Sequence, residues 1–187
     1  MKKAFPIALL ILGLVFVGAG IYTTARGFQA KDEVRQALVA QNITTPEDAS
    51  IPNALVDDAA TAHAMAQIIG VHAEEATGGE TYAEMGRFLT PDGGDTSDEA
   101  AALKDEAGNP VSNPLRAVAF QASALQTSLH TSHMAFNVAD LVIGLGALIV
   151  VLGFAVFGIG VALGSLAIPS VARKLHVEPV AAVRQAA

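Results

Sequence analysis

Two histidines, His130 and His133, stand three residues apart shortly before a long apolar run that begins at Leu141. Residues at this spacing share one face of a helix, so the two imidazoles are able to chelate one metal ion if a third ligand comes from elsewhere. His72 and Glu75, which are also three residues apart, are candidate ligands from a neighbouring helix. The spacing therefore allows a metal site, and a pH response is a further alternative because histidine titrates near neutrality.

A structural role for His130 and His133 is the favoured alternative. The pair lacks the HExxH spacing of zinc-binding helices, and an amphipathic ring is well suited to the membrane-facing shoulder of a helix. The acidic stretch PDGGDTSDEA also lacks the ligand spacing of an EF-hand, which favours a solvated loop. No Ser-His-Asp arrangement, phosphate loop or basic aromatic patch emerges, so we expect no catalytic residues, no cofactor and no nucleic-acid partner.

Two uncharged apolar runs, residues 4–25 and 141–172, stand near the two ends of the chain. Each is long enough to cross a hydrocarbon core of ~30 Å as a helix. Lys2 and Lys3 precede the first run, as in a secretory signal, but its apolar stretch exceeds the usual ~7–15 residues, which favours a retained anchor. We predict an all-α membrane protein with a first span in 1–25, an outer segment in 26–140, a second span in 141–168 and a tail in 169–187.

The charge distribution predicts the orientation of these spans. Residues 26–140 carry 6 basic and 17 acidic side chains, whereas the rest of the chain carries 5 basic and 1 acidic. No Lys or Arg lies between Ala117 and Ala172, but Arg173 and Lys174 follow at once, as expected on a cytoplasmic side. We therefore expect a membrane protein with both termini cytoplasmic and residues 26–140 extracytoplasmic. The chain has no cysteine, so no disulfide stabilises that segment.

Glycine recurs every seventh residue in both apolar runs. Residues seven apart share one helix face, and small residues let helix backbones approach closely in lipid. The pattern predicts two antiparallel transmembrane helices packed along a glycine seam, and a GxxxG pair at Gly160 and Gly164 offers a second contact. The predicted packing residues are Gly13, Gly20, Gly146, Gly153, Gly160 and Gly164.

The same seven-residue register predicts that both helices continue beyond the bilayer as a stalk. The second register runs without a break from Leu115 to Ala167, with Asn113 as a cap and Pro114 in the first helical position. The first helix is expected to continue through KDEVRQALVAQ, residues 31–41. We therefore expect helices that are longer than the membrane requires.

A small helical domain with an acidic loop is predicted between the two stalk segments. Asp57 or Asp58 is a candidate cap for an amphipathic helix that ends at residues 78–79. Thr81 and Glu84 have the spacing of a capping box, which predicts another short helix. Residues 90–113 are rich in Gly, Pro, Asp and Asn, and they predict a loop with a small hairpin at residues 108–109.

Four segments resemble a group of small bacterial two-span membrane proteins of unassigned function: ITTPEDA, VHAEEATGGETYAEM, FQASALQTSLHTSHMAF and the glycine-rich final span. The resemblance covers most of residues 1–170, and GGETYAE is its most distinctive part. Such chains are often labelled aromatic ring-opening dioxygenases, but the resemblance brings no catalytic motif. The family pattern has apolar residues at the positions of His130 and His133, so this chain departs from it there. The resemblance implies the two-span topology and no mechanism.

These patterns favour a non-enzymatic membrane protein whose outer helices bind or position another component of the cell envelope. The expected partners are the lipid bilayer and either another membrane protein or a second copy of the chain. The alternative is an extracytoplasmic enzyme or metal-binding module built on His72, Glu75, His130 and His133. A pore formed by oligomerisation is a third hypothesis, because neither span carries an internal charge.

Overall fold

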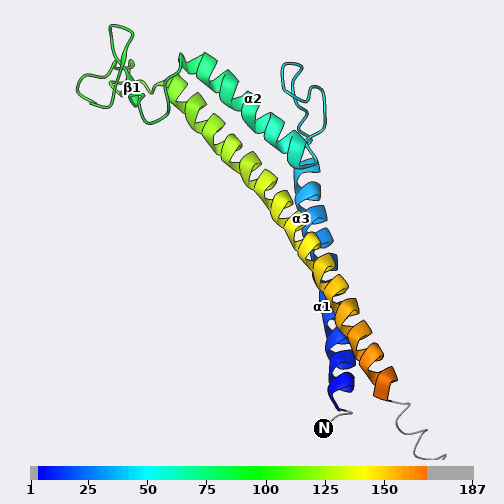
Figure 1. Cartoon of the computed structure of the whole chain (residues 1–187). Helices are drawn as coiled ribbons and strands as arrows, with labels where there is room; N and C mark the ends of the chain where they lie inside the picture. The colour runs from blue at the N-terminus through cyan, green and yellow to red at the C-terminus, as the bar shows by residue number, and fades with distance from the viewer. Residues whose placement is uncertain (1–3, 168–187) are drawn as a thin grey trace, which may run out of the picture. The chain divides into compact units, whose positions relative to one another are not determined.

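The computed structural model describes residues 4–167 of the 187-residue chain. In chain order its elements are α1 (Ala4–Val39), α2 (Ala59–Thr77), β1 (Phe88–Leu89), β2 (Asp95–Thr96) and α3 (Pro114–Ala167) (Figure 1). They fall into two compact units. We call residues 4–29 with 140–167 the apolar unit and residues 30–139 the polar unit.

The described residues are mostly helical, which fits the predicted all-α fold. α1 has 36 residues and α3 has 54, and both are long and apolar enough to cross a membrane. Each helix continues past its apolar run, as the heptad register predicts: α1 reaches Val39, and α3 begins at Pro114. The predicted end of the second span at residue 168 and the predicted tail lie outside the described residues.

In the apolar unit, buried positions recur every seventh residue. A methyl group added at Gly20 would lie 2.6 Å from the carbonyl oxygen of Gly146, and one added at Gly153 would lie 2.9 Å from that of Gly13. A side chain at these positions would overlap the facing backbone, so glycine is what permits the close approach. The repeating buried residues are Pro6, Gly13, Gly20 and Gly27 on α1 and Gly146, Gly153 and Gly160 on α3.

The remaining glycines of the apolar unit differ in their surroundings. The nearest neighbour of Gly164 is Pro6 of α1, whose Cβ would lie 3.9 Å from an added methyl group, an ordinary contact. Gly18, Gly144 and Gly158 have no atom within 4 Å of such a methyl group. The close approach is therefore confined to one face of each helix.

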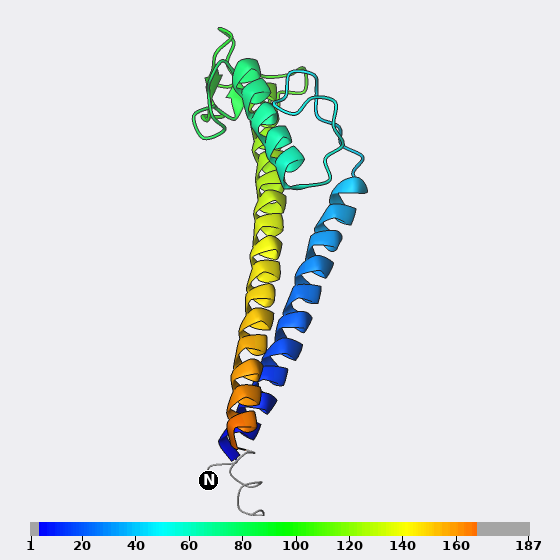
Figure 2. The same ribbon diagram turned by 45° about the vertical axis from the view of Figure 1, so that its right-hand side comes forward.

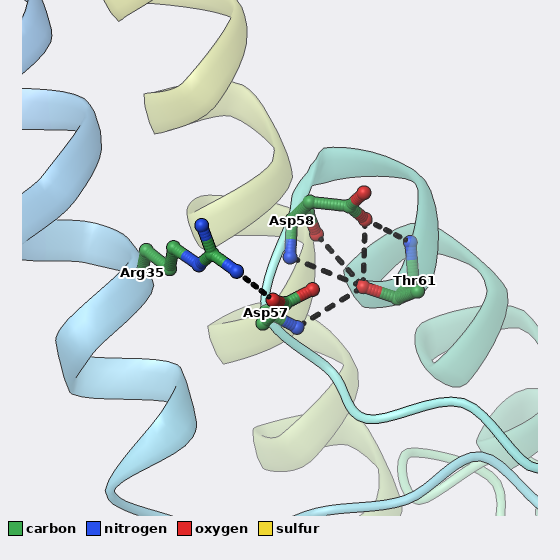
Figure 3. A network of polar contacts seen from close by, with 4 residues as sticks. All are labelled: Arg35, Asp57, Asp58 and Thr61. Atoms are coloured by element: carbon green, nitrogen blue, oxygen red, sulfur yellow. Dashed lines mark hydrogen bonds and ion pairs between the residues drawn. The ribbon is translucent and has the colours of Figure 1, made fainter.

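In the polar unit, α2 begins and ends as its sequence predicts. Asp58 is the N-cap: its carboxylate accepts a hydrogen bond from the Thr61 backbone N–H at 2.8 Å, and the Thr61 hydroxyl accepts one from the Asp58 N–H at 3.1 Å. Figure 3 shows this reciprocal pair beside an ion pair of 2.6 Å between Arg35 of α1 and Asp57. The helix ends at Gly78, whose φ of 66° is readily adopted by glycine.

α2 runs alongside the first part of α3 in both views (Figures 1 and 2). The side chain of Gln126 donates to the Ala66 carbonyl at 3.2 Å, and Gly70 leaves space for the same glutamine. Apolar side chains from all three helices and the loop before α2 form the core. Its buried members are Leu38, Val56, Ala62, Ala66, Leu129 and Phe136.

The segment between α2 and α3 differs from its prediction at Thr81. Glu84 does accept hydrogen bonds from the Thr81 backbone N–H and hydroxyl, at 2.9 and 2.7 Å, as in a capping box. However, the chain makes a turn there and no helix, so the predicted short helix is wrong. At Gly86 the chain passes so close to Thr96 that a side chain would overlap its backbone, and the local capping signal is overruled by this packing.

The acidic loop is ordered by hydrogen bonds that converge on Asn113. Its side chain donates to Asp95 at 2.9 Å and to the Gly86 carbonyl at 3.2 Å, and accepts from the Leu115 N–H at 3.0 Å. The last bond confirms Asn113 as the cap of α3. β1 and β2 form a small antiparallel pair that the sequence did not predict, whereas the predicted hairpin is present as a bridge between Lys104 and residue 110.

Candidate functional site

The candidate metal ligands on α2 lie in an exposed setting. His72 Nε2 is 2.7 Å from Asp48 Oδ2, and both side chains are about half exposed. The hydrogen bond from His72 lowers the pKa of Asp48 below its ordinary value. Glu75 is exposed on the same helix. His72 therefore has a carboxylate neighbour from the loop after α1.

His130 and His133 instead lie beside a third histidine, His63 of α2. The ring centroid of His63 is 4.9 Å from that of His133 and 5.7 Å from that of His130. His133 Nδ1 is 2.8 Å from the Ala59 carbonyl oxygen, and its Nε2 is 3.0 Å from the Asn137 amide nitrogen. These partners suit a neutral ring that donates from Nδ1 and accepts at Nε2.

The three rings form a packing cluster between α2 and α3. Within residues 4–167, no group of three or more His, Cys, Asp or Glu side chains is placed to hold a metal ion. The structure therefore does not assemble His72, Glu75, His130 and His133 into the predicted site. His63 Nδ1 is buried and has no hydrogen-bond partner among the described residues. Sequence reasoning missed His63 because its spacing to His130 depends on how α2 packs on α3.

An apolar groove of about 710 Å³ lies in the polar unit. We call it the outer groove. Its walls come from helix faces with a spacing of three and four residues, and no charged or titratable side chain lines it. The main lining residues are Val34, Ala37, Leu38 and Gln41 from α1 and the turn after it, Met65 and Ile69 from α2, and Leu125, Ser128, Leu129, Ser132 and Ala135 from α3.

The hydroxyl groups of the outer groove donate hydrogen bonds within α3. Ser128 donates to the Ala124 carbonyl at 3.1 Å, and Ser132 donates to the Ser128 carbonyl at 3.1 Å. Thr131 donates to the Thr127 carbonyl at 2.7 Å. Because each hydroxyl proton is used within α3, the oxygen lone pairs remain for an incoming donor.

No family model, curated protein or solved structure matches this chain. Its function must therefore be inferred from its own helices, groove and charges. A volume of this size, mostly apolar and with a few polar groups, is in the usual range of binding pockets. The outer groove is therefore the candidate functional site.

Proposed function

We propose that the chain is a two-span integral protein of the bacterial plasma membrane, whose polar unit is a non-enzymatic scaffold for another component of the envelope. The supporting observation is the glycine seam between two helices that are otherwise covered with exposed apolar side chains. Leu14 and Leu141 are each 60% exposed, and Phe154 is 61% exposed. Such a surface is costly in water, at about 25 cal/mol per Å², but is suited to lipid.

The seam supports an antiparallel hairpin. Residues that ascend along α1 meet residues that descend along α3: Leu10 lies against Gly160, Gly13 against Gly153, and Gly20 against Gly146. Two antiparallel spans have both ends on one side of the bilayer. This arrangement would display the polar unit on the other side.

The outer groove supports binding as the role of the polar unit. Its lining has no His, Asp, Glu, Lys, Cys or Tyr, so it offers no side chain for general acid-base chemistry. Leu125 is 51% exposed although it lines the groove. A partner that covers such side chains would gain hydrophobic free energy.

The hairpin is tested by replacing glycines with leucine on α3. Gly153→Leu places a large side chain against the backbone of Gly13 and Val17, and overpacking of this kind costs about 1–3 kcal/mol. We expect the melting temperature of the detergent-solubilised protein to fall by about 5 °C or more. The matched control is Gly158→Leu on the same helix, where an added side chain meets open space.

The control should melt within about 2 °C of the wild type, since exposed substitutions have small effects. Both variants and the wild type should stay in the membrane fraction after an alkaline wash. Equal melting temperatures for the two variants would remove the seam as the packing surface. Release of the wild type by the wash would contradict integral insertion.

A further inference from the structure

We infer that the outer groove binds an amphipathic helix with basic flanking residues, contributed by a partner protein. The inference rests on the proposed scaffold function and names the chemistry of the partner. It is based on three features of the polar unit: the helical spacing of the groove lining, the charge around the groove, and the hydrogen-bonding capacity of its hydroxyl groups.

The lining has the geometry of an incomplete helix bundle. α3 contributes Leu125, Ser128, Leu129 and Ser132, which follow the i, i+3, i+4, i+7 pattern of one helix face. α1 and the turn after it contribute Val34, Ala37, Leu38 and Gln41 in the same pattern. Helices pack by fitting the rows of side chains on one helix into the grooves of another, so a further helix fits between these faces. The α3 lining runs from Leu125 to Ala135, eleven residues that rise by about 15 Å in three turns.

The charge of the polar unit specifies the flanks of that helix. The segments that line the groove, residues 30–70 and 114–139, carry 3 basic and 6 acidic side chains, although the lining itself is uncharged. Asp32 and Glu33 directly precede Val34 in the chain, and Glu47 follows Ile43 closely. Asp48 is already paired with His72. A helix with an apolar face and Lys or Arg beside it would complement both the groove and its surroundings.

The same charge disfavours a second copy of the chain as the occupant. A second polar unit would bring its own excess of 11 negative charges against the first. Lys31 and Arg35 are the basic residues close to Val34 in the chain, and Arg35 is engaged in an ion pair of 2.6 Å with Asp57. Like-charge repulsion therefore favours a partner of opposite charge.

The hydroxyl groups disfavour an anionic lipid. Ser128, Thr131 and Ser132 donate to carbonyl groups within α3, so they present acceptors to the groove. A phosphate or carboxylate would find only the amide of Gln41 as a side-chain donor among the lining residues. Lys and Arg side chains, which only donate, suit these acceptors.

The test uses the full chain in nanodiscs of zwitterionic phosphatidylcholine. The probe is a fluorescent amphipathic peptide of leucine and lysine, about 14 residues long, which is slightly longer than the groove. Its Kd is measured by fluorescence anisotropy, with empty nanodiscs as the background. We expect saturable binding that weakens with salt, and at least about tenfold weaker binding of the same peptide with glutamate in place of lysine.

Groove-filling variants locate the binding. Ala135→Trp and Ala37→Trp occupy the groove from its two walls and should each raise the Kd about tenfold or more. The matched control is Ala124→Trp, an exposed position of α3 outside the groove lining, which should leave the Kd unchanged. Two filling variants on different helices guard against misfolding of either one, and their melting temperatures are measured in parallel.

Several outcomes would overturn the inference. Equal binding of the lysine and glutamate peptides, or no effect of either filling variant, would exclude a basic helix in the groove. A co-purifying lipid that Ala135→Trp excludes, without peptide binding, would identify an acyl-chain site. A dimer that Ala135→Trp dissociates would identify a self-interface. None of these results affects the glycine-seam test, so failure here is distinguishable from failure of the hairpin.

Discussion

At the scale of single residues, the cap of α2 gives a pH-dependent prediction. The Asp58 carboxylate accepts hydrogen bonds from the backbone N–H and the hydroxyl of Thr61 (Figure 3). Both bonds lower the pKa of Asp58, and the backbone bond has the larger effect. These bonds stabilise the charged form, so their contribution is present above the ordinary pKa of an aspartate and is lost as the pH falls through the lowered value. Acid should therefore loosen the start of α2.

Asp58→Ala should lower the free energy of unfolding by about 1 kcal/mol at neutral pH, the usual cost of losing an N-cap. The deficit should shrink as the pH is lowered from 7 towards about 2, because the wild type then loses the charged cap as well. Denaturant unfolding of the full chain, followed by its helical signal, measures this difference. Asp58→Asn keeps a capping oxygen and is the control, and a deficit that does not change with pH would contradict the charge-based account.

The histidine cluster gives the second residue-scale prediction. His130 and His133 both contact His63, so we predict that the pair packs α3 against α2 and does not hold a metal ion. Replacing both by glutamine should leave the metal content unchanged and cost about 1 kcal/mol of stability through the lost ring packing and the lost bond to Ala59. Elemental analysis of purified wild type and double variant provides the measurement. Stoichiometric zinc or iron in the wild type, lost in the variant, would favour the metal-binding alternative.

At the scale of elements, the features that the sequence predicts are those encoded locally. Asp58 and Gly78 mark the ends of α2 because a cap and a left-handed glycine act within one turn. Asn113 and Pro114 mark the start of α3 for the same reason. The seven-residue glycine spacing likewise predicts which face of each long helix is buried, since helical periodicity depends on spacing alone.

Elements that depend on distant contacts were not predictable from spacing. The Thr81–Glu84 capping bonds form, but Gly86 then passes against Thr96 and the chain does not continue as a helix. His63 lies beside His130 because of the register between α2 and α3. Hydrogen bonds such as that from Gln126 to the Ala66 carbonyl fix this register. For the same reason the outer groove, which combines three segments, has no signature in any one of them.

At the scale of the whole molecule, charge and apolar surface are divided between the two units. Residues 30–139 carry a net charge of −11, and the rest of the chain carries +4. In bacteria, basic residues that flank a span are retained in the cytoplasm, and Arg173 and Lys174 directly follow the second apolar run. The charges around the first run are less one-sided, because Lys2 and Lys3 before it compete with Arg26, Lys31 and Arg35 after it. The second run therefore decides the predicted orientation.

This orientation predicts the behaviour of a reporter enzyme that is active only outside the cytoplasm. Inserted at Gly94, in the turn between β1 and β2, it should be active, and fused after Ala187 it should be inactive, because two spans return the chain to its starting side. A reporter that is active only inside provides the control and should give the opposite pattern. Reversal of both patterns would mean that Lys31 and Arg35 are retained in the cytoplasm. Release of residues 26–140 from the membrane with a new N-terminus would mean that the first apolar run is cleaved as a signal, in which case the seam between Gly13 and Gly153 would be absent from the mature protein.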